Sequence, residues 1–244
     1  MTRIAVISDI HGNCAALDVA LADILRASVD HIVCLGDAIQ GGAQPAATVQ
    51  RLRELACPVV MGNADAWMLT GVETGGEPVT ETQERVRQWS LAQLSPDDRA
   101  FIAAFAPTVT VPLSAERALL CFHGSPASFD EILLPTTPAD EFRRALAPYA
   151  PAIMTGGHTH LQQVRPLDET FFFNPGSVGL AYNHDQPDGD FRLNPWAEYA
   201  ILSETDGAIG LEFRRVSLPL ETLREALATS GHPNVEKLLG EYGL

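Results

Sequence analysis

Short aliphatic runs that each lead into a polar residue recur along this chain, and they constrain its fold more than any other feature. Such runs, bounded by turn signals, are typical of buried strands. The polar residues that follow them are Asp9, His11, Asp37, Asn63, His123, His158 and His160. Because open α/β sheets place their active sites at the carboxyl ends of strands, we expect these seven side chains to gather in one site.

The chemistry of these side chains indicates a metal site. Aspartate, asparagine and imidazole without thiolate suit divalent manganese, iron or zinc better than a cysteine-rich structural zinc. Seven ligands are too many for one ion but suit two ions about 3.5–4 Å apart that share a bridging carboxylate. We therefore expect two divalent metal ions as cofactors, with manganese first and iron, zinc or nickel as alternatives. Residues at i and i+2 of an extended chain face the same side, so Asp9/His11 and His158/His160 can address adjacent positions.

Five sequence blocks in order resemble the calcineurin-like metallophosphoesterase superfamily. The superfamily pattern D-x-H, G-D, G-N-x-[DE], H-G and G-H-x-H is matched at D9-I-H11, G36-D37, G62-N63-A-D65, H123-G124 and G157-H158-T-H160. The run N174-P-G-S-V-G179 is similar to that of the small bacterial and archaeal phosphodiesterase-like branch. The order of strands and helices and this resemblance both predict an α/β fold, a four-layer α/β/β/α sandwich of two mixed β-sheets flanked by helices.

The resemblance also implies a role for each ligand, and the same seven residues would form the catalytic set. Asp9, His11 and His160 would hold the first metal, and Asp37 would bridge both ions. The second metal would be held by Asn63, His123 and His158. Asn63 and His123 would in addition contact the substrate.

One residue departs from the pattern of the phosphoprotein phosphatases, in which a histidine follows the metal-binding asparagine. Here that residue is Ala64. A positioned general acid contributes about 10²–10⁴-fold to a rate, and poor leaving groups need it most. Ala64 therefore favours phosphodiester or phosphoanhydride substrates over phosphoserine. Water or another side chain can take over the role of the acid, and His184 is a candidate.

The composition of the chain limits the kinds of molecule that the protein is expected to bind. With 16 basic and 31 acidic residues, the chain has a formal net charge of -15. Such a surface repels the nucleic-acid backbone and acidic membranes, which favours a small phosphorylated substrate over a polymer or a membrane. Four cysteines stand singly and no signal peptide or membrane span is apparent, so we expect a cytoplasmic protein.

The chain is expected to form a single domain over residues 1–244, with a helical insert at about 65–107 and C-terminal helices at about 219–240. The insert follows a ligand directly, which fits either a lid over the substrate or a helical layer of the core. The C-terminal helices could pack on the domain or on a second copy in a homo-oligomer.

Several residues outside the ligand set invite interpretation. The turn that begins at Asn174 either holds the second sheet or presents Ser177 to a phosphate, and the structural role is favoured. Tyr182 and Arg192, in and before the polar loop 183–194, are predicted to contact the substrate. His31, His184 and His232 lack a partner pattern, so a surface or loop position is expected for each.

The sequence thus predicts a dinuclear metal-dependent phosphoesterase that hydrolyses phosphodiester or phosphoanhydride bonds of small, nucleotide-type substrates with metal-activated water. A protein or small-molecule phosphomonoesterase is the alternative within enzymes. The third hypothesis is a non-catalytic interaction protein that keeps the fold, and the complete ligand set disfavours it.

Overall fold

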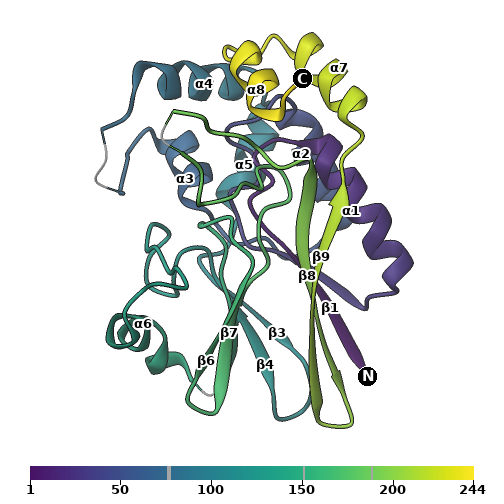
Figure 1. Ribbon diagram of the computed structural model, residues 1–244, viewed down its shortest axis with the longest axis vertical. Coiled ribbons are helices and arrows are strands. Elements are labelled where there is room, and N and C mark those ends of the chain that lie inside the picture. Colours follow the sequence, from purple (N-terminus) through teal and green to yellow (C-terminus); the bar gives the residue numbers. More distant parts are fainter. Residues whose placement is uncertain (76–77, 151, 188) are drawn as a thin grey trace.

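A computed structural model describes four segments of the chain, residues 1–75, 78–150, 152–187 and 189–244 (Figure 1). The insert predicted at about 65–107 and the polar loop 183–194 therefore lie partly outside the described residues. Among the described residues, no helix combines the length and the hydropathy needed to cross a membrane.

The first sheet has four strands in the order β2-β1-β8-β9. Their bounds are β1 (Thr2–Ile7), β2 (His31–Cys34), β8 (Trp196–Thr205) and β9 (Ala208–Ser217). β1 and β2 are parallel and are joined by helix α1 (Cys14–Ala27), whereas β8 and β9 form an antiparallel hairpin that pairs with β1. Asn13 caps α1, because its side chain accepts a hydrogen bond of 3.1 Å from the Ala16 amide.

The second sheet has five strands in the order β3-β4-β5-β7-β6. Their bounds are β3 (Val109–Pro112), β4 (Ala118–Cys121), β5 (Ile153–Thr155), β6 (Gln163–Leu167) and β7 (Thr170–Asn174). The three central strands are parallel and both edge strands are antiparallel, so this sheet is mixed like the first. Helix α6 (Ala139–Leu146) and the 3₁₀ turn η1 (Ala147–Tyr149) connect β4 to β5.

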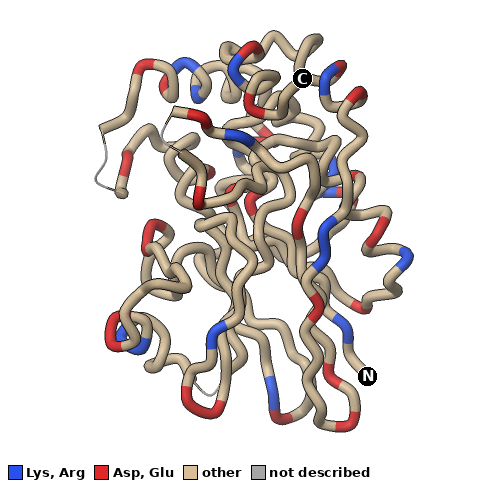
Figure 2. The backbone as a smooth tube through the Cα atoms, in the orientation of Figure 1, with Lys and Arg blue, Asp and Glu red and all other residues tan. Residues whose placement is uncertain are grey.

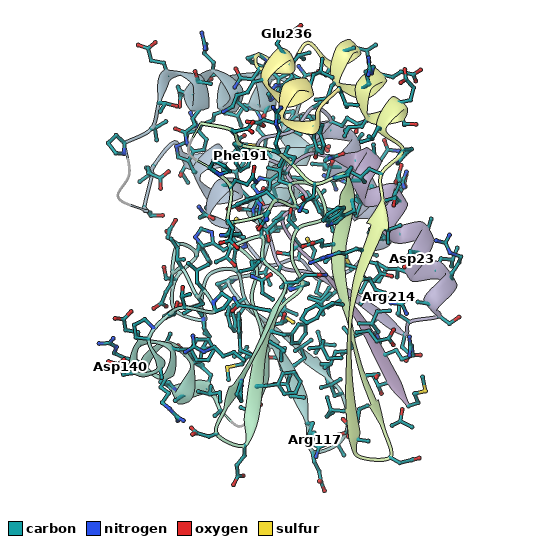
Figure 3. The ribbon with its side chains drawn as sticks, in the orientation of Figure 1. Asp23, Arg117, Asp140, Phe191, Arg214 and Glu236 are labelled. Carbon is teal, nitrogen blue, oxygen red and sulfur yellow. The ribbon has the colours of Figure 1, made fainter. Side chains whose placement is uncertain are left out.

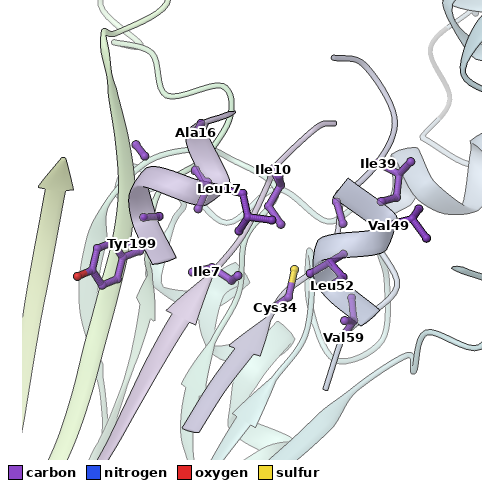
Figure 4. Packing of buried hydrophobic residues seen from close by; sticks show 14 of the residues in the cluster. Ile7, Ile10, Ala16, Leu17, Cys34, Ile39, Val49, Leu52, Val59 and Tyr199 are labelled. Atoms are coloured by element: carbon purple, nitrogen blue, oxygen red, sulfur yellow. The ribbon is translucent and has the colours of Figure 1, made fainter. Parts of the chain in front are cut away.

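Alternating burial along the strands stacks the two sheets face to face. Ile4 and Val6 of β1 share an apolar cluster with Phe173 of the second sheet. Ile7 of β1 faces the other way and packs with Leu17 of α1 and Leu52 of α2 (Pro45–Leu55), as Figure 4 shows. Since successive strand residues face opposite sides of a sheet, each strand of the first sheet contributes to both cores.

The outer face of the second sheet is covered by α6. Phe172, the neighbour of Phe173 in sequence, packs edge-on against Phe142 of α6 with ring centroids 5.7 Å apart. Figure 1 shows α6 beside the second sheet and α1 beside the first, with the two sheets between them. The predicted four-layer α/β/β/α sandwich is confirmed.

The segment after Asn63 is helical, and its first helix begins two residues before the insert predicted at about 65–107. It contains α3 (Asn63–Thr70), α4 (Glu81–Ala92) and α5 (Pro96–Ala103), and α3 begins at the candidate ligand itself. The strand expected before Asn63 is reduced to the bridges Cys34–Val59 and Val60–Ala106.

The insert contributes a structural layer. Ile102 of α5 is fully buried and, with Phe105, joins the apolar cluster that covers the first sheet. Both α4 and α5 begin with a capping box, formed by Thr80 with Gln83 and by Ser95 with Asp98. The alternative of a helical core layer is therefore correct for α5, while α4 lies farther out and borders the site.

The C-terminal helices α7 (Leu220–Ser230) and α8 (Val235–Tyr242) pack on their own chain. Leu223 and Leu227 of α7 join the cluster over the first sheet. The Tyr242 hydroxyl of α8 donates a hydrogen bond of 2.6 Å to the Gly179 carbonyl, near the ligand loops. These contacts place α8 close to the ends of the strands that carry the candidate ligands.

Acidic side chains are distributed over the whole molecule. Figure 2 shows them on the helices and on the hairpin turns at the lower end of the sheets alike. The net charge of -15 is therefore not the property of one acidic tail or one patch. A spread of this kind gives a general repulsion of polyanions rather than a docking surface.

Candidate metal centre

The seven candidate ligands lie where the parallel strands of both sheets end. Asp9 follows β1, Asp37 follows β2, His123 follows β4 and His158 follows β5. Asn63 is the first residue of α3, directly after the bridge at Val60. The two sheets converge at these carboxyl ends, so side chains far apart in sequence reach one place, as the sequence predicted.

Five of the seven residues have left-handed backbone conformations. Their φ angles are 53° for Asp9, 49° for His11, 47° for Asp37, 67° for His158 and 55° for His160. This conformation costs a non-glycine residue about 1–2 kcal/mol, and such strain is concentrated at functional sites. The surrounding structure must therefore hold these loops in place.

Backbone hydrogen bonds between the loops supply that support. The Asp9 amide donates to the Gly36 carbonyl at 3.0 Å, and the His11 amide donates to the Asp37 carbonyl at 2.8 Å. Across the two sheets, the His158 amide donates to Asp9 Oδ2 at 3.2 Å. Every ligand loop is thus fixed relative to another ligand loop.

Two glycines permit the closest approaches within this network. A Cβ atom on Gly62 would lie 2.1 Å from Asp37 Oδ1, and one on Gly157 would lie 2.7 Å from Asp9 Oδ2. Neither distance is tolerable for a carbon atom against a fixed carboxylate. The glycines of G-N-x-D and G-H-x-H are therefore required by the packing of the carboxylates.

Asp9, His11 and His160 form the first cluster, with ligand atoms all within 4.8 Å of one another. His11 Nε2 lies 3.1 Å from His160 Nε2, and His160 Nε2 lies 3.3 Å from Asp9 Oδ1. Asp9 Oδ1 is buried and has no hydrogen-bond partner in the described part of the chain. Three donor atoms thus converge on one small volume.

Asp37, His123 and His158 form the second cluster. His123 Nε2 lies 3.0 Å from Asn63 Oδ1 and 3.3 Å from Asp37 Oδ2, and the His123 and His158 ring centroids are 5.2 Å apart. Asp37 Oδ2 also lies 3.8 Å from His11 Nε2 of the first cluster. Asp37 therefore stands between the clusters, where a bridging carboxylate would have to be.

The histidine tautomers are fixed by backbone carbonyls. Nδ1 of His11 lies 2.7 Å from the Gln40 carbonyl, Nδ1 of His123 lies 2.8 Å from that of Leu35, and Nδ1 of His160 lies 2.9 Å from that of Leu180. A carbonyl can only accept, so each Nδ1 donates its hydrogen and each Nε2 presents a lone pair. Imidazole ligands of metals are oriented in this way.

This donor set fits two cations. Lone pairs of His11 and His160 that face each other at 3.1 Å repel unless a positive charge lies between or beside them. The same holds where Asn63 Oδ1 and the Asp37 carboxylate face His123 Nε2. Nitrogen and oxygen donors without thiolate suit a borderline divalent ion at each cluster.

In the absence of a metal, protons take its place on some of these groups. Burial lowers the pKa of His123, but the Asp37 carboxylate outweighs this effect and raises the pKa to about 9. Burial likewise opposes a raised pKa at His160, and the Asp9 carboxylate overcomes it. His11 has a lowered pKa, chiefly because of burial.

Asp65, the last residue of the G-N-x-D motif, supports the site, although the motif alone does not indicate how. Its buried carboxylate accepts hydrogen bonds from the Ala38 amide at 2.8 Å and from the Ile39 amide at 2.9 Å. Burial and the negative charge of Asp37 raise the pKa of Asp65 to about 7. Asp65 thereby clamps the loop that carries Asp37, and the motif G-N-x-D was the signal for it.

The turn after β7 has the structural role that the sequence favoured. Ser177 is fully buried, and its hydroxyl donates a hydrogen bond of 2.7 Å to the Asp9 carbonyl. The Asn174 side chain donates to the Gly157 carbonyl at 2.6 Å and to the Thr159 hydroxyl at 3.1 Å. The turn therefore ties the loops of Asp9 and His158 together.

Of the two predicted substrate contacts outside the ligand set, only Tyr182 adjoins the centre. Its ring centroid lies 5.6 Å from that of His160, and it packs on His184 and on Phe191, which Figure 3 labels. Arg192 instead pairs with Asp190 at 3.0 Å, and its guanidinium donates to the Gly240 carbonyl at the end of α8. The substrate roles of both residues stay predictions.

The remaining histidines belong to neither ligand cluster. His31 and His184 are exposed, as expected, and His184 Nε2 lies 2.8 Å from the Thr159 carbonyl. His232 lies in the loop between α7 and α8, but it is buried rather than at the surface. Its ring packs edge-on against that of Trp89 of α4, with ring centroids 4.9 Å apart. No pattern in the sequence predicted this contact.

Comparison with known proteins agrees with this geometry. The model of the calcineurin-like phosphoesterase superfamily domain matches residues 2–192. The chain therefore belongs to the calcineurin-like phosphoesterase superfamily, whose members are metal-dependent. The match ends at residue 192, so β8 and β9 and the C-terminal helices α7 and α8 lie beyond it.

Similar proteins match this chain over nearly all of its residues. An uncharacterised protein of Methanocaldococcus jannaschii is 29% identical over 253 residues, which cover 95% of this chain and 94% of that protein. A hypothetical protein from Pyrococcus horikoshii superposes with a TM-score of 0.81 at 16% identity, over 100% of this chain and 99% of the other. A metallophosphoesterase from Sphaerobacter thermophilus superposes with a TM-score of 0.74 at 24% identity, over 98% of this chain and 97% of the other. These two structures support the fold.

Metal binding should release protons, because His123, whose pKa is raised to about 9, holds a proton near neutral pH when no metal is bound. The apparent metal affinity should rise with pH up to about 9, the raised pKa of His123. Calorimetric titration of metal-free protein with Mn²⁺ in buffers of different ionisation enthalpy measures the released protons. His123→Gln should reduce the release, and His31→Gln, at an exposed histidine, should not. Affinity that is independent of pH over this range would contradict the assignment.

Proposed function

We propose that this protein is a dinuclear metal-dependent phosphoesterase that hydrolyses phosphodiester or phosphoanhydride bonds of small, nucleotide-type substrates. Asp9, His11 and His160 would hold one ion, and Asn63, His123 and His158 would hold the other, with Asp37 between them. The observation that carries the proposal is the convergence of imidazole lone pairs fixed by backbone carbonyls. A stable fold gains nothing from such repulsion, so the arrangement favours a bound cation.

The overall reaction joins a water oxygen to phosphorus and breaks the bond between phosphorus and the leaving oxygen, which departs as an alcohol or a phosphate. When bound, two divalent ions lower the pKa of a water molecule and neutralise charge that develops on the phosphoryl oxygens. The protein groups hold the ligand side chains in place. The Ala64 amide contributes to this orientation through a hydrogen bond of 2.8 Å to Asp37 Oδ1.

Ala64 is the residue from which we infer which phosphoesters the protein prefers. A methyl group cannot protonate a leaving alkoxide, and Ala64 borders the open cavity beside the centre. Leaving groups of low pKa, such as nucleotide phosphates and aryl oxides, suffer least from the lack of an acid. This supports diester or anhydride substrates over phosphoserine, and a phosphomonoesterase is the alternative.

Manganese is our first choice of metal, with iron, zinc and nickel as alternatives, because all accept this set of nitrogen and oxygen donors. We also propose that the protein works in the cytoplasm as one domain. All four cysteines are free, and three of them are buried, which suits a reducing compartment. The complete ligand set speaks against a purely non-catalytic interaction protein.

A substrate comparison tests the proposal. Protein loaded with Mn²⁺ should hydrolyse bis(p-nitrophenyl) phosphate or a nucleotide anhydride faster than phosphoserine peptides under identical conditions. Asp37→Asn should lower turnover by at least about 10²-fold, above the range for groups that only support a metal ligand. Asp206→Asn is a matched control, because Asp206 is also left-handed, with φ of 50°, but lies in the exposed β8–β9 turn. Preferential hydrolysis of phosphoserine would overturn the preference, and inactivity on all substrates would overturn the function.

Placing a proton donor at position 64 should shift the substrate preference. Ala64→His should raise monoester turnover relative to diester turnover, by at most about 10²–10⁴-fold, because it supplies an acid near the leaving oxygen. Ala66→His, on the same helix but outside the cavity wall, is the control. Steady-state kcat/KM for both substrate types measures the ratio. An unchanged ratio, with the imidazole seen to point into the cavity, would contradict the leaving-group explanation.

A further inference from the structure

A cavity of about 770 Å³ opens directly beside the metal centre. One end of it is formed by His11, Asn63 and Ala64, so a molecule in the cavity reaches both candidate clusters. Its volume lies within the range of about 300–1,000 Å³ that is typical of small-molecule sites. The cavity is therefore the natural place for the part of a substrate that extends beyond the reacting phosphate.

Two segments from opposite ends of the sequence form its walls. Thr82 and Gln83, at the start of α4, belong to the insert, whereas Asn234 and Lys237 belong to α8 and the loop before it. Figure 1 shows α4 and α8 side by side above α3. The second wall thus comes from helices that lie beyond the family match.

A buried contact joins the walls. The edge-on pair of Trp89 and His232 connects α4 to the loop between α7 and α8, with ring centroids 4.9 Å apart. His232 Nδ1 accepts a hydrogen bond of 3.1 Å from the Asn234 amide, which leaves Nε2 as the donor of the ring. His232 Nε2 is buried without a partner among the described residues, and His232 lines the cavity.

The described residues that line the cavity carry few charged side chains, and acidic ones outnumber basic ones. These charged side chains are Lys237, the only lysine of the chain, together with Glu73 and Glu241. Lys237 Nζ is already paired with Glu241 Oε1 at 3.6 Å. The residues outside the described segments are glycine, glutamate, proline and aspartate, so they add no cation to any wall.

The uncharged part of the wall is mixed. Trp67, Val86 and Leu238 give an apolar surface. The Thr82 hydroxyl, the Gln83 side-chain NH₂ and the Asn234 side-chain amide give hydrogen-bonding groups, whereas the Thr80 hydroxyl and Gln83 Oε1 are engaged in the capping box of α4. Apolar walls with a few polar groups suit a heterocycle that carries hydroxyl groups. A phosphate would instead call for arginine or several lysines.

We propose that this cavity binds an uncharged, nucleoside-type ester half of a phosphodiester and selects against an anhydride. This assignment rests on the proposed function of the metal centre. In a diester, the nucleoside begins at the first atom beyond the reacting phosphate. In an anhydride, a second phosphate lies at that position and would face Glu73 and Glu241. Among the described residues that line the cavity, the one cation is Lys237, which is paired with Glu241. The Arg85 guanidinium lies 3.2 Å from Thr82 Oγ1 but does not line the cavity.

Two probes and one filled-cavity variant test the binding of the nucleoside. The probes are thymidine 5′-(methyl phosphate) and dimethyl phosphate, whose affinities for the Mn²⁺-loaded protein are measured by calorimetry. Thr82→Trp should weaken the nucleoside diester by about tenfold, a loss typical of a few pocket contacts, and leave dimethyl phosphate unchanged. Glu81→Trp is the matched control, because Glu81 is the preceding residue of α4 but does not line the cavity.

A charge substitution tests the selection against anhydrides. Glu73→Lys should raise the affinity for thymidine diphosphate relative to the nucleoside diester several-fold, which is the effect of an exposed charge pair. Glu236→Lys adds the same charge on α8 outside the cavity wall, where Figure 3 labels Glu236 at the outer end of the molecule. This control should leave the ratio of affinities unchanged.

The outcomes separate the cavity from the catalytic proposal. Equal losses of both probes in Thr82→Trp, or no loss of either, would overturn the cavity assignment. An unchanged ratio in Glu73→Lys would overturn the selection against anhydrides. Selective loss of the nucleoside probe in a protein that hydrolyses neither diesters nor anhydrides would uphold the cavity and overturn the proposed hydrolysis.

Discussion

The repulsion among donor atoms that converge at the strand ends governs the architecture of this site. Three histidines are locked by carbonyls so that their Nε2 lone pairs point inward, and two buried carboxylates face the same volume. No rotation of a ring relieves this without breaking a hydrogen bond. The unfavourable electrostatic energy is relieved only by positive charge, either protons on His123 and His160 or metal ions.

The surrounding fold holds the loops that carry these mutually repelling donor atoms in place. Left-handed residues turn the loops of both sheets toward one another, and hydrogen bonds from one ligand loop to the next keep them there. Asp65 and Ser177 add support from outside the centre, each through backbone groups of a ligand loop. The rigid four-layer core behind these loops supplies the stability that such strained loops lack.

Much of this could be predicted from the sequence, because the signals are local. A ligand directly after an aliphatic run and the spacing of Asp9 with His11 need only the chain itself and the geometry of strands. The start of α3 at Asn63 was missed, since a ligand at the end of a run suggests a loop. Burial of His232 was also missed, because it depends on Trp89, which lies far away in sequence.

The cavity beside the centre could not be predicted for the same reason. Its walls come from residues near 80 and near 235, and their proximity follows from the packing of α7 and α8 against the first sheet. The loop with Tyr182 and Arg192 looked equally suited to substrate recognition in the sequence. In the structure Arg192 is engaged with Asp190 and the end of α8, and neither residue lines this cavity.

The central claim is that two ions share Asp37. Electron paramagnetic resonance of the Mn²⁺-saturated protein tests it most directly, because two manganese ions about 3.5–4 Å apart with a common bridge are exchange-coupled. We expect the spectrum of a coupled pair at two equivalents of metal, and loss of the coupling in Asp37→Asn. A spectrum of isolated manganese at saturation would contradict the shared site.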